Sequence, residues 1–175
     1  MNRKILIPLA TLLGAGAIAV GSGATFSSTT GNTISAVTAG SLSHTNSKDG
    51  QAIFSLTNLK PGDVLNGTLT LKNTGSLAAA FSLTEVSSAN TFSGSNLTLD
   101  VVDTTNGNTP VYSGTFGGLV DGAKTDLGTW AANESHTFRF TVKLNQDTPN
   151  ADQGKSANAV YSWSSVQLSG ETTNQ

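Results

Sequence analysis

The sequence predicts an all-β protein, an antiparallel β-sandwich of the jelly-roll or immunoglobulin-like type that follows a cleaved signal helix. Short runs of alternating apolar and polar residues recur along the chain, and turns rich in Gly, Pro and Asn separate them. Ser, Thr and Asn make up over a third of the 175 residues, whereas charged residues account for only 11%. This composition is typical of sheets with one solvated face.

The first 24 residues have the features of a secretory signal peptide. Arg3 and Lys4 precede an uncharged stretch at 5–20, which is shorter than the roughly 20 residues of a membrane span. An uncleaved membrane anchor is the alternative, but no cluster of charges follows the stretch. We expect a signal peptidase to cut between Ala24 and Thr25. The product would be one sandwich domain at 25–175, secreted or on the cell surface, without stable membrane insertion.

Within this domain, the clearest predicted strand covers residues 137–144. Phe138, Phe140, Val142 and Leu144 alternate there with polar residues, as in a strand with one buried face. In chain order, similar patterns predict strands at 53–56, 69–72, 77–84, 97–101 and 111–116.

The last predicted strand covers residues 157–168. Tyr161 and Trp163 share one face, whereas Val166 and Leu168 fall one position out of phase. A β-bulge near residues 164–165 would bring both pairs to the same face. Residues 152–159 are also compatible with a helical turn.

Composition excludes several classes of function. The chain has no Cys, which excludes a disulfide scaffold, a thiol nucleophile and a Cys-ligated metal site. Loss of Arg3 and Lys4 would leave seven basic against eleven acidic residues. Such a mildly acidic chain is not expected to bind nucleic acid.

Three stretches resemble the TasA/camelysin family of exported bacterial surface and biofilm-matrix proteins. The first is the signal with the short sequences at 24–27 and 39–42, and the third is the aromatic strand at 161–168. The second is the sharpest, an NLKPGD sequence followed by an N-x-G-S sequence. Its residues are Asn58, Leu59, Lys60, Pro61, Gly62, Asp63, Asn73, Gly75 and Ser76. We interpret this motif as structural, a set of turns between strands.

The resemblance implies an exported sandwich protein that is processed by a dedicated signal peptidase and self-associates into homopolymeric fibres. A paralogous minor subunit is a further implied partner. In such fibres the N-terminal segment of one subunit adds as a strand to the next. Residues 25–37 suit this role because they carry no charge and no Pro. Within this segment we expect the donor residues to be Thr25, Phe26, Ile34 and Val37. The alternatives are that the segment forms the domain's own first strand or an unstructured tail.

The name camelysin also implies an alternative function as a cell-surface metalloendopeptidase. Many zinc proteases place two His on one helix face through a His-Glu-x-x-His sequence. This chain has only His44 and His136, far apart in sequence, with Asp49 and Glu134 as nearby acids. We therefore expect no catalytic residue, no metal and no cofactor. We expect His44 to lie in a loop and His136 to be exposed at a strand start.

Two other sites are weaker candidates. A monomeric, adhesin-like glycan-binding module could stack sugars on Tyr112, Trp130, Tyr161 and Trp163, although packing in the core or at its rim is the simpler expectation. The oxygen-rich loop at 145–152 is reminiscent of a calcium site, but it lacks the spacing and closing Glu of an EF-hand.

Overall fold

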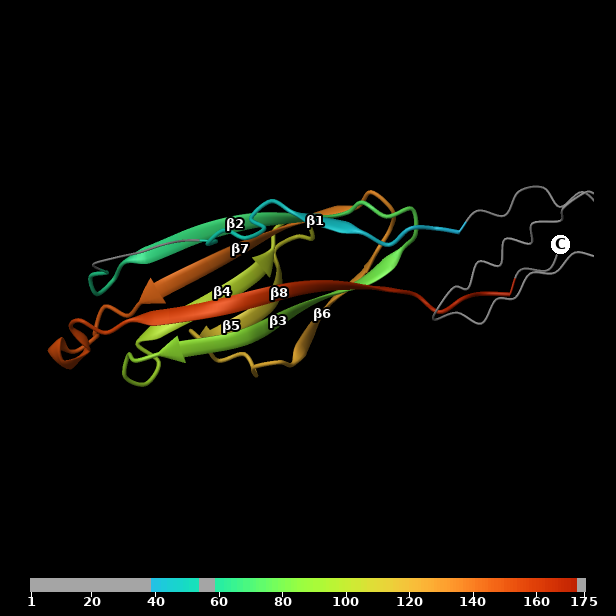
Figure 1. Cartoon of the computed structure of the whole chain (residues 1–175). Helices are drawn as coiled ribbons and strands as arrows, with labels where there is room; N and C mark the ends of the chain where they lie inside the picture. The colour runs from blue at the N-terminus through green and yellow to red at the C-terminus, as the bar shows by residue number, and fades with distance from the viewer. Residues whose placement is uncertain (1–38, 54–58, 173–175) are drawn as a thin grey trace, which may run out of the picture. The chain divides into compact units, whose positions relative to one another are not determined.

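The computed structural model describes residues 39–53 and 59–172. In this part of the chain it contains eight β-strands and one short 3₁₀ helix, and no helix that is long and apolar enough to cross a bilayer (Figure 1). The elements are β1 (His44–Asn46), β2 (Val64–Asn73), β3 (Ala79–Asn90), β4 (Leu97–Asp103), β5 (Thr109–Thr115), β6 (Lys124–Trp130), β7 (Ser135–Leu144), η1 (Asn150–Asp152) and β8 (Ala157–Gln167).

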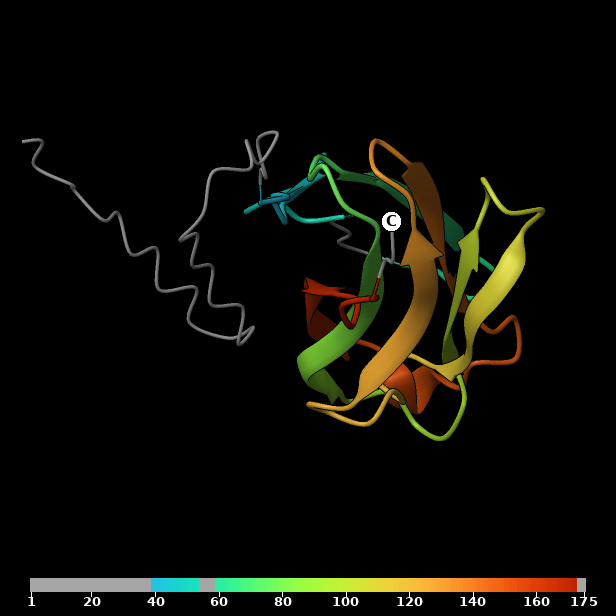
Figure 2. The same ribbon diagram turned by 90° about the vertical axis from the view of Figure 1, so that its right-hand side faces the viewer.

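The strands form two antiparallel sheets, which confirms the predicted all-β class and is consistent with a β-sandwich (Figure 2). One sheet has the order β1-β2-β7-β4-β5, and the other has the order β6-β3-β8. The Phe138 and Phe140 rings of β7 lie 5.3 and 5.5 Å from the Trp163 and Tyr161 rings of β8. β8 is the last strand of the three-stranded sheet and faces β7 across the core. The strands β2 and β1 of the five-stranded sheet therefore extend beyond the edge of β8.

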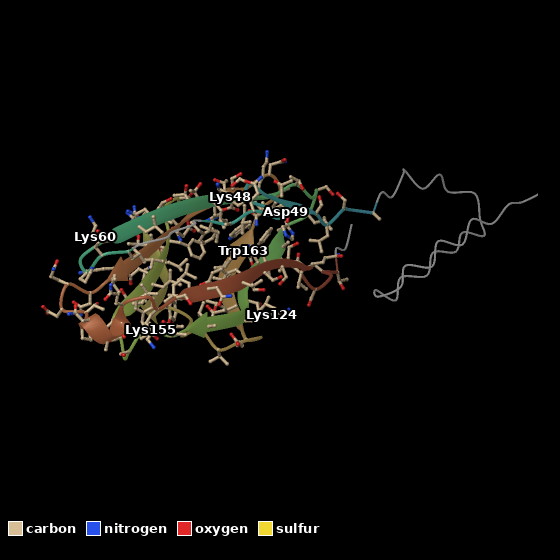
Figure 3. The ribbon with its side chains drawn as sticks, turned by 60° about the vertical axis from the view of Figure 1, so that its left-hand side comes forward. Lys48, Asp49, Lys60, Lys124, Lys155 and Trp163 are labelled. Carbon is tan, nitrogen blue, oxygen red and sulfur yellow. The ribbon has the colours of Figure 1, made fainter. Side chains whose placement is uncertain are left out.

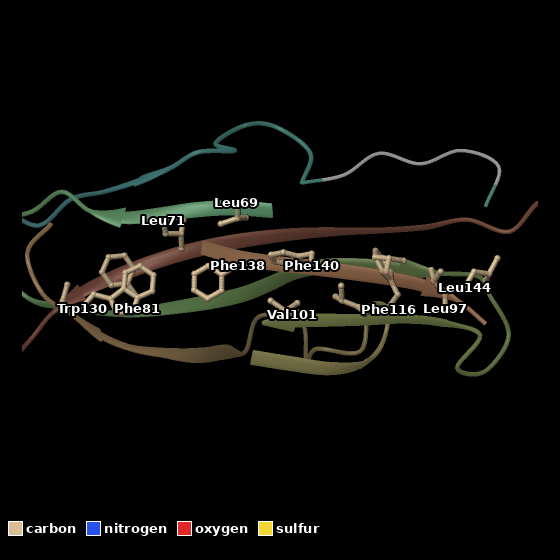
Figure 4. Packing of buried hydrophobic residues seen from close by; sticks show 13 residues of the cluster. Leu69, Leu71, Phe81, Leu97, Val101, Phe116, Trp130, Phe138, Phe140 and Leu144 are labelled. Carbon is tan, nitrogen blue, oxygen red and sulfur yellow. The ribbon is translucent and has the colours of Figure 1, made fainter. Parts of the chain in front are cut away.

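The core follows from the alternation along each strand. The even-numbered apolar residues of β7, from Phe138 to Leu144, are at most 3% exposed, while their neighbours face outward or are partly covered. They pack with buried side chains from the other strands (Figure 4), among them Leu69, Leu71, Phe81, Leu97, Val101, Phe116 and Trp130. Each such side chain contributes about 1.5–3 kcal/mol on burial, so a one-residue slip would be costly.

Asn73 of the N-x-G-S motif is fully buried at the end of β2. Its side-chain amide donates to the carbonyls of Leu77, Trp130 and Ala131 at 2.9–3.2 Å. Its side-chain oxygen accepts the Gly75 N–H at 3.0 Å. These bonds connect the turn after β2 to the turn after β6, so the motif residue joins two parts of the chain nearly 60 residues apart.

The Pro-Gly-Asp sequence forms a turn before β2. The Lys60 N–H donates to Asp63 Oδ2 at 2.8 Å, and the Asp63 N–H donates back to the Lys60 carbonyl at 2.9 Å. Gly62 has a φ of 90°, which a residue with a side chain rarely adopts. Gly62 N–H also donates to Leu144 at 2.9 Å, so the turn is fixed to the end of β7.

The structure contains two strands that the alternation did not predict, the three-residue β1 and the longer β6. β6 pairs with β3, and the register shifts where Phe81 lies opposite Gly128 and Ser82 lies opposite Asp126. Gly128 has a φ of 90°. The extra residue in this bulge interrupts the alternation of inward and outward side chains, and the sequence pattern therefore does not predict the strand.

The prediction of a bulge near residues 164–165 was wrong. The β3–β8 pairing is continuous there, and its register shifts instead on the partner strand, between Glu85 and Ser87. Val166 and Leu168 consequently stay out of phase with Trp163 and are 52% and 42% exposed. The helical turn is η1, which ends at Asp152, and residues 157–159 already belong to β8. Of the predicted strand at 53–56, Ile53 is not in a strand, and the rest lies outside the described residues.

Candidate functional site

A long groove runs along the sandwich where the three-stranded sheet ends. It has a volume of about 1430 Å³ and lies between the free edge of β8 and the segments that flank β2 (Figure 3). Among the described strands, β8 pairs only with β3. Within residues 39–53 and 59–172, backbone groups along its other edge therefore have no strand partner and could pair with an added strand.

The floor of the groove is apolar and its lips are mixed. The side chains at the floor belong to the core: Leu65, Leu69, Leu97, Phe116, Val142 and Leu144. One lip is β8, which contributes Ala157, Ala159, Tyr161 and Trp163, and the other consists of residues 48–53 and 59–61. An apolar floor beside a free strand edge is the combination that binds extended peptides.

The two ends of the groove differ. At one end, which we call the closed end, His44 Nδ1 of β1 lies 2.9 Å from Ser165 Oγ of β8, so a hydrogen bond joins the lips. At the other end, the open end, Lys60 and Lys155 lie on opposite lips (Figure 3). No hydrogen bond between described residues joins 59–61 to 148–156 there.

A buried polar pair lies behind the middle of β8. Glu85 of β3 is paired in register with Tyr161 and is 1% exposed. Neither its carboxylate nor the Tyr161 hydroxyl makes a hydrogen bond to a described residue. Burial, together with the nearby Glu85 carboxylate, raises the pKa of the Tyr161 hydroxyl.

A second polar cluster surrounds His136, which does not line the groove. Its Nδ1 lies 2.5 Å from Asp103 Oδ2 and its Nε2 lies 3.0 Å from Glu134 Oε1. The ring stacks on Trp130 with centroids 4.2 Å apart. The Ala131 N–H, with help from His136, lowers the pKa of the Glu134 carboxyl. The expectation of an exposed His136 was wrong, because Asp103 from β4 provides the partner that lets the ring be buried.

A model of the family described as camelysin metallo-endopeptidase matches residues 1–101, which is more than half of the chain. The chain belongs to this camelysin family. A comparison with curated proteins gives no match. The camelysin match covers the predicted signal, the segment after it and the strands from β1 into β4.

The camelysin description names a metallopeptidase, but the described residues do not fit a metal centre. Both ring nitrogens of His136 already face carboxylate oxygens, and His44 Nδ1 faces Ser165. The stacked rings of Phe81 and Trp130 lie between the two imidazoles. Within residues 39–53 and 59–172, no three His, Asp or Glu side chains converge to hold an ion.

The remaining predicted sites separate in the structure. His44 lies in β1 and not in a loop. Trp130 is buried, while Tyr161 and Trp163 pack against β7, so these aromatic residues belong to the core and its rim. Asp152 accepts hydrogen bonds from Ser93 and Asn96, which leaves its carboxylate already satisfied.

The predicted cleavage site, the donor residues 25–37 and Asn58 of the motif lie outside the described residues. The rest of the motif lies in turns and strand ends and does not line a common site, although Leu59, Lys60 and Pro61 border the groove. Alternation in the sequence did not predict the groove. The groove exists because the three-stranded sheet ends at β8, and no single segment of the sequence contains that information.

Proposed function

We propose that this chain is an exported structural protein of the bacterial cell surface or biofilm matrix whose copies assemble into fibres by donor-strand addition. The observation that carries this proposal is the groove along β8, with its apolar floor and free backbone edge. An added strand there would cover the floor and satisfy main-chain groups of β8. Membership of the camelysin family supports export to the cell surface.

The proposed donor is the segment 25–37, which we call the arm. Cleavage between Ala24 and Thr25 would free it, and it contains Phe26, Ile34 and Val37 but no charged side chain. Thirteen residues in extended form span about 43 Å, which exceeds the length of β8. When the arm of each copy binds the groove of the next, the contact is head-to-tail and produces an open filament.

Negative-stain microscopy of two purified chains tests the proposal. One chain begins at Thr25, and the other begins at Thr38 and lacks the arm. We expect filaments from the first and single particles from the second. A third chain keeps the full length of the arm but carries Phe26→Ser and Ile34→Ser. It should also fail to form filaments, which separates the role of the apolar side chains from that of the length of the arm. Filaments that form equally well without the arm would contradict donor-strand addition.

A further inference from the structure

The groove is closed at the end where the chain's own arm is attached. The described chain begins at Ala39, and the Ser41 N–H donates to Ser76 Oγ at 2.8 Å in the turn between β2 and β3. β1 pairs His44 with Asn73 at the same end of the sandwich. The His44–Ser165 bond that joins the lips is also there, near the end of β8.

We propose that the His44–Ser165 closure prevents the arm from entering its own groove and makes the groove accept the arm of a second copy, antiparallel to β8. This inference rests on the fibre function proposed above. An arm that entered its own groove would start at the closed end and run parallel to β8. An arm from a neighbour in a head-to-tail filament enters at the open end, between Lys60 and Lys155.

The direction follows from which end of the arm enters first. Val37 is joined to the body of the donor copy, so it stays at the open end of the acceptor. Thr25 and Phe26 then extend toward the closed end. β8 runs from Ala157 at the open end to Gln167 at the closed end. The N-to-C direction of the arm is therefore opposite to that of β8.

The spacing of apolar residues in the arm agrees with this arrangement. Phe26 and Ile34 are eight positions apart, so both face the floor if the arm is a strand. With Phe26 opposite Trp163, where the lining of the groove ends, Asn32 lies opposite Ala157. Ile34 then lies at the open end, beside Leu59 and Leu144. The hydroxyl and amide residues between Phe26 and Ile34 cover the middle of β8, near the unpaired Tyr161 and Glu85.

The absence of native Cys makes disulfide mapping a clean test of direction. One chain carries Asn32→Cys with Ala157→Cys, and its matched control carries Ser28→Cys with Ala157→Cys. In the antiparallel arrangement residue 28 lies opposite Tyr161, about 13 Å along the strand from residue 157. We expect the Asn32 variant alone to give a ladder of disulfide-linked oligomers on non-reducing gels after mild oxidation.

The other outcomes have distinct meanings. A ladder from the Ser28 variant, or a disulfide within single chains of either variant, would overturn the antiparallel arrangement while leaving filaments possible. Absence of filaments from the unsubstituted processed chain would overturn the fibre function and this inference together.

The role of the closure is tested by His44→Ala, with Thr45→Ala on the same strand as the control. Opening the closed end should raise the fraction of monomeric chain at equilibrium at least several-fold in sedimentation experiments. The Thr45 variant should match the unsubstituted chain. Equal monomer fractions for His44→Ala, unsubstituted chain and control would show that the closure does not prevent self-insertion.

Discussion

Asn73 shows how one buried amide can join distant turns. Its side chain makes four hydrogen bonds, to Leu77, Trp130, Ala131 and Gly75, and it is fully buried. Replacement by Ala removes all four bonds, of which those to the Trp130 carbonyl and from the Gly75 N–H are buried. We expect Asn73→Ala to lower the free energy of unfolding by about 2–4 kcal/mol, as measured by urea denaturation of the chain that begins at Thr38.

Asn66 on the same strand provides the control. Its side chain is exposed and accepts a single hydrogen bond, from Thr141. Asn66→Ala should therefore change stability by no more than about 0.5 kcal/mol. If both variants unfolded at the same urea concentration, Asn73 would not stabilise the joined turns.

The sequence predicted where such residues lie but not what they do. The N-x-G-S motif begins at Asn73, the last residue of β2, and continues into the bend that follows. The burial of Asn73 depends on carbonyl groups of residues 130 and 131, which come close only when β6 and β7 pair with their neighbours. The burial of His136 likewise depends on Asp103, and no local pattern contains that information.

At the scale of elements, strands with strict alternation were predictable, whereas the three-residue β1 and the bulged β6 were not. Residues 137–144 lie within β7 and residues 97–101 within β4 because side chains of one parity face the core. β6 escaped prediction because Gly128 and the bulge beside it interrupt the period. The groove was not predicted for a further reason, because its existence depends on how many strands each sheet contains.

The segment that leads into β8 depends on Asp152, and this dependence is sensitive to pH. Asn96 and Ser93 donate hydrogen bonds to Asp152 and hold the pKa of its carboxyl below the usual 3.8. A carboxyl with a lower pKa in the folded state stabilises that state at higher pH, and the contribution is lost as the pH falls through the folded value. We expect the urea midpoint to decrease below about pH 4, and part of this decrease to be absent from Asp152→Asn.

The matched control for this experiment is Asp121→Asn. Asp121 is exposed in the loop between β5 and β6 and makes no hydrogen bond to a described side chain or backbone group through its carboxylate. This variant should retain the pH dependence of the unsubstituted chain. A decrease of the same size in the Asp152 and Asp121 variants would contradict the role of the Asp152 bonds.

At the scale of the whole molecule, the proposed contact between copies is apolar and main-chain in character. The arm carries no charged side chain, and the processed chain has seven basic against eleven acidic residues. Association driven by opposite charges slows steeply as salt screens them, whereas strand addition does not depend on such attraction. We expect the elongation rate, followed by light scattering, to change less than about threefold between roughly 20 and 300 mM NaCl.

The cations at the groove provide the contrasting case. Lys48, Lys60 and Lys155 border it, and they would attract acidic surfaces of a neighbour if charge drove assembly (Figure 3). A chain with Lys60→Gln and Lys155→Gln should elongate at nearly the same rate as the unsubstituted chain, because these side chains lie on the lips and not at the floor. A tenfold loss of rate in that variant, together with strong inhibition by salt, would instead assign the contact to the lysines. Filaments would then form by charge pairing, and the uncharged arm would not be their connecting strand.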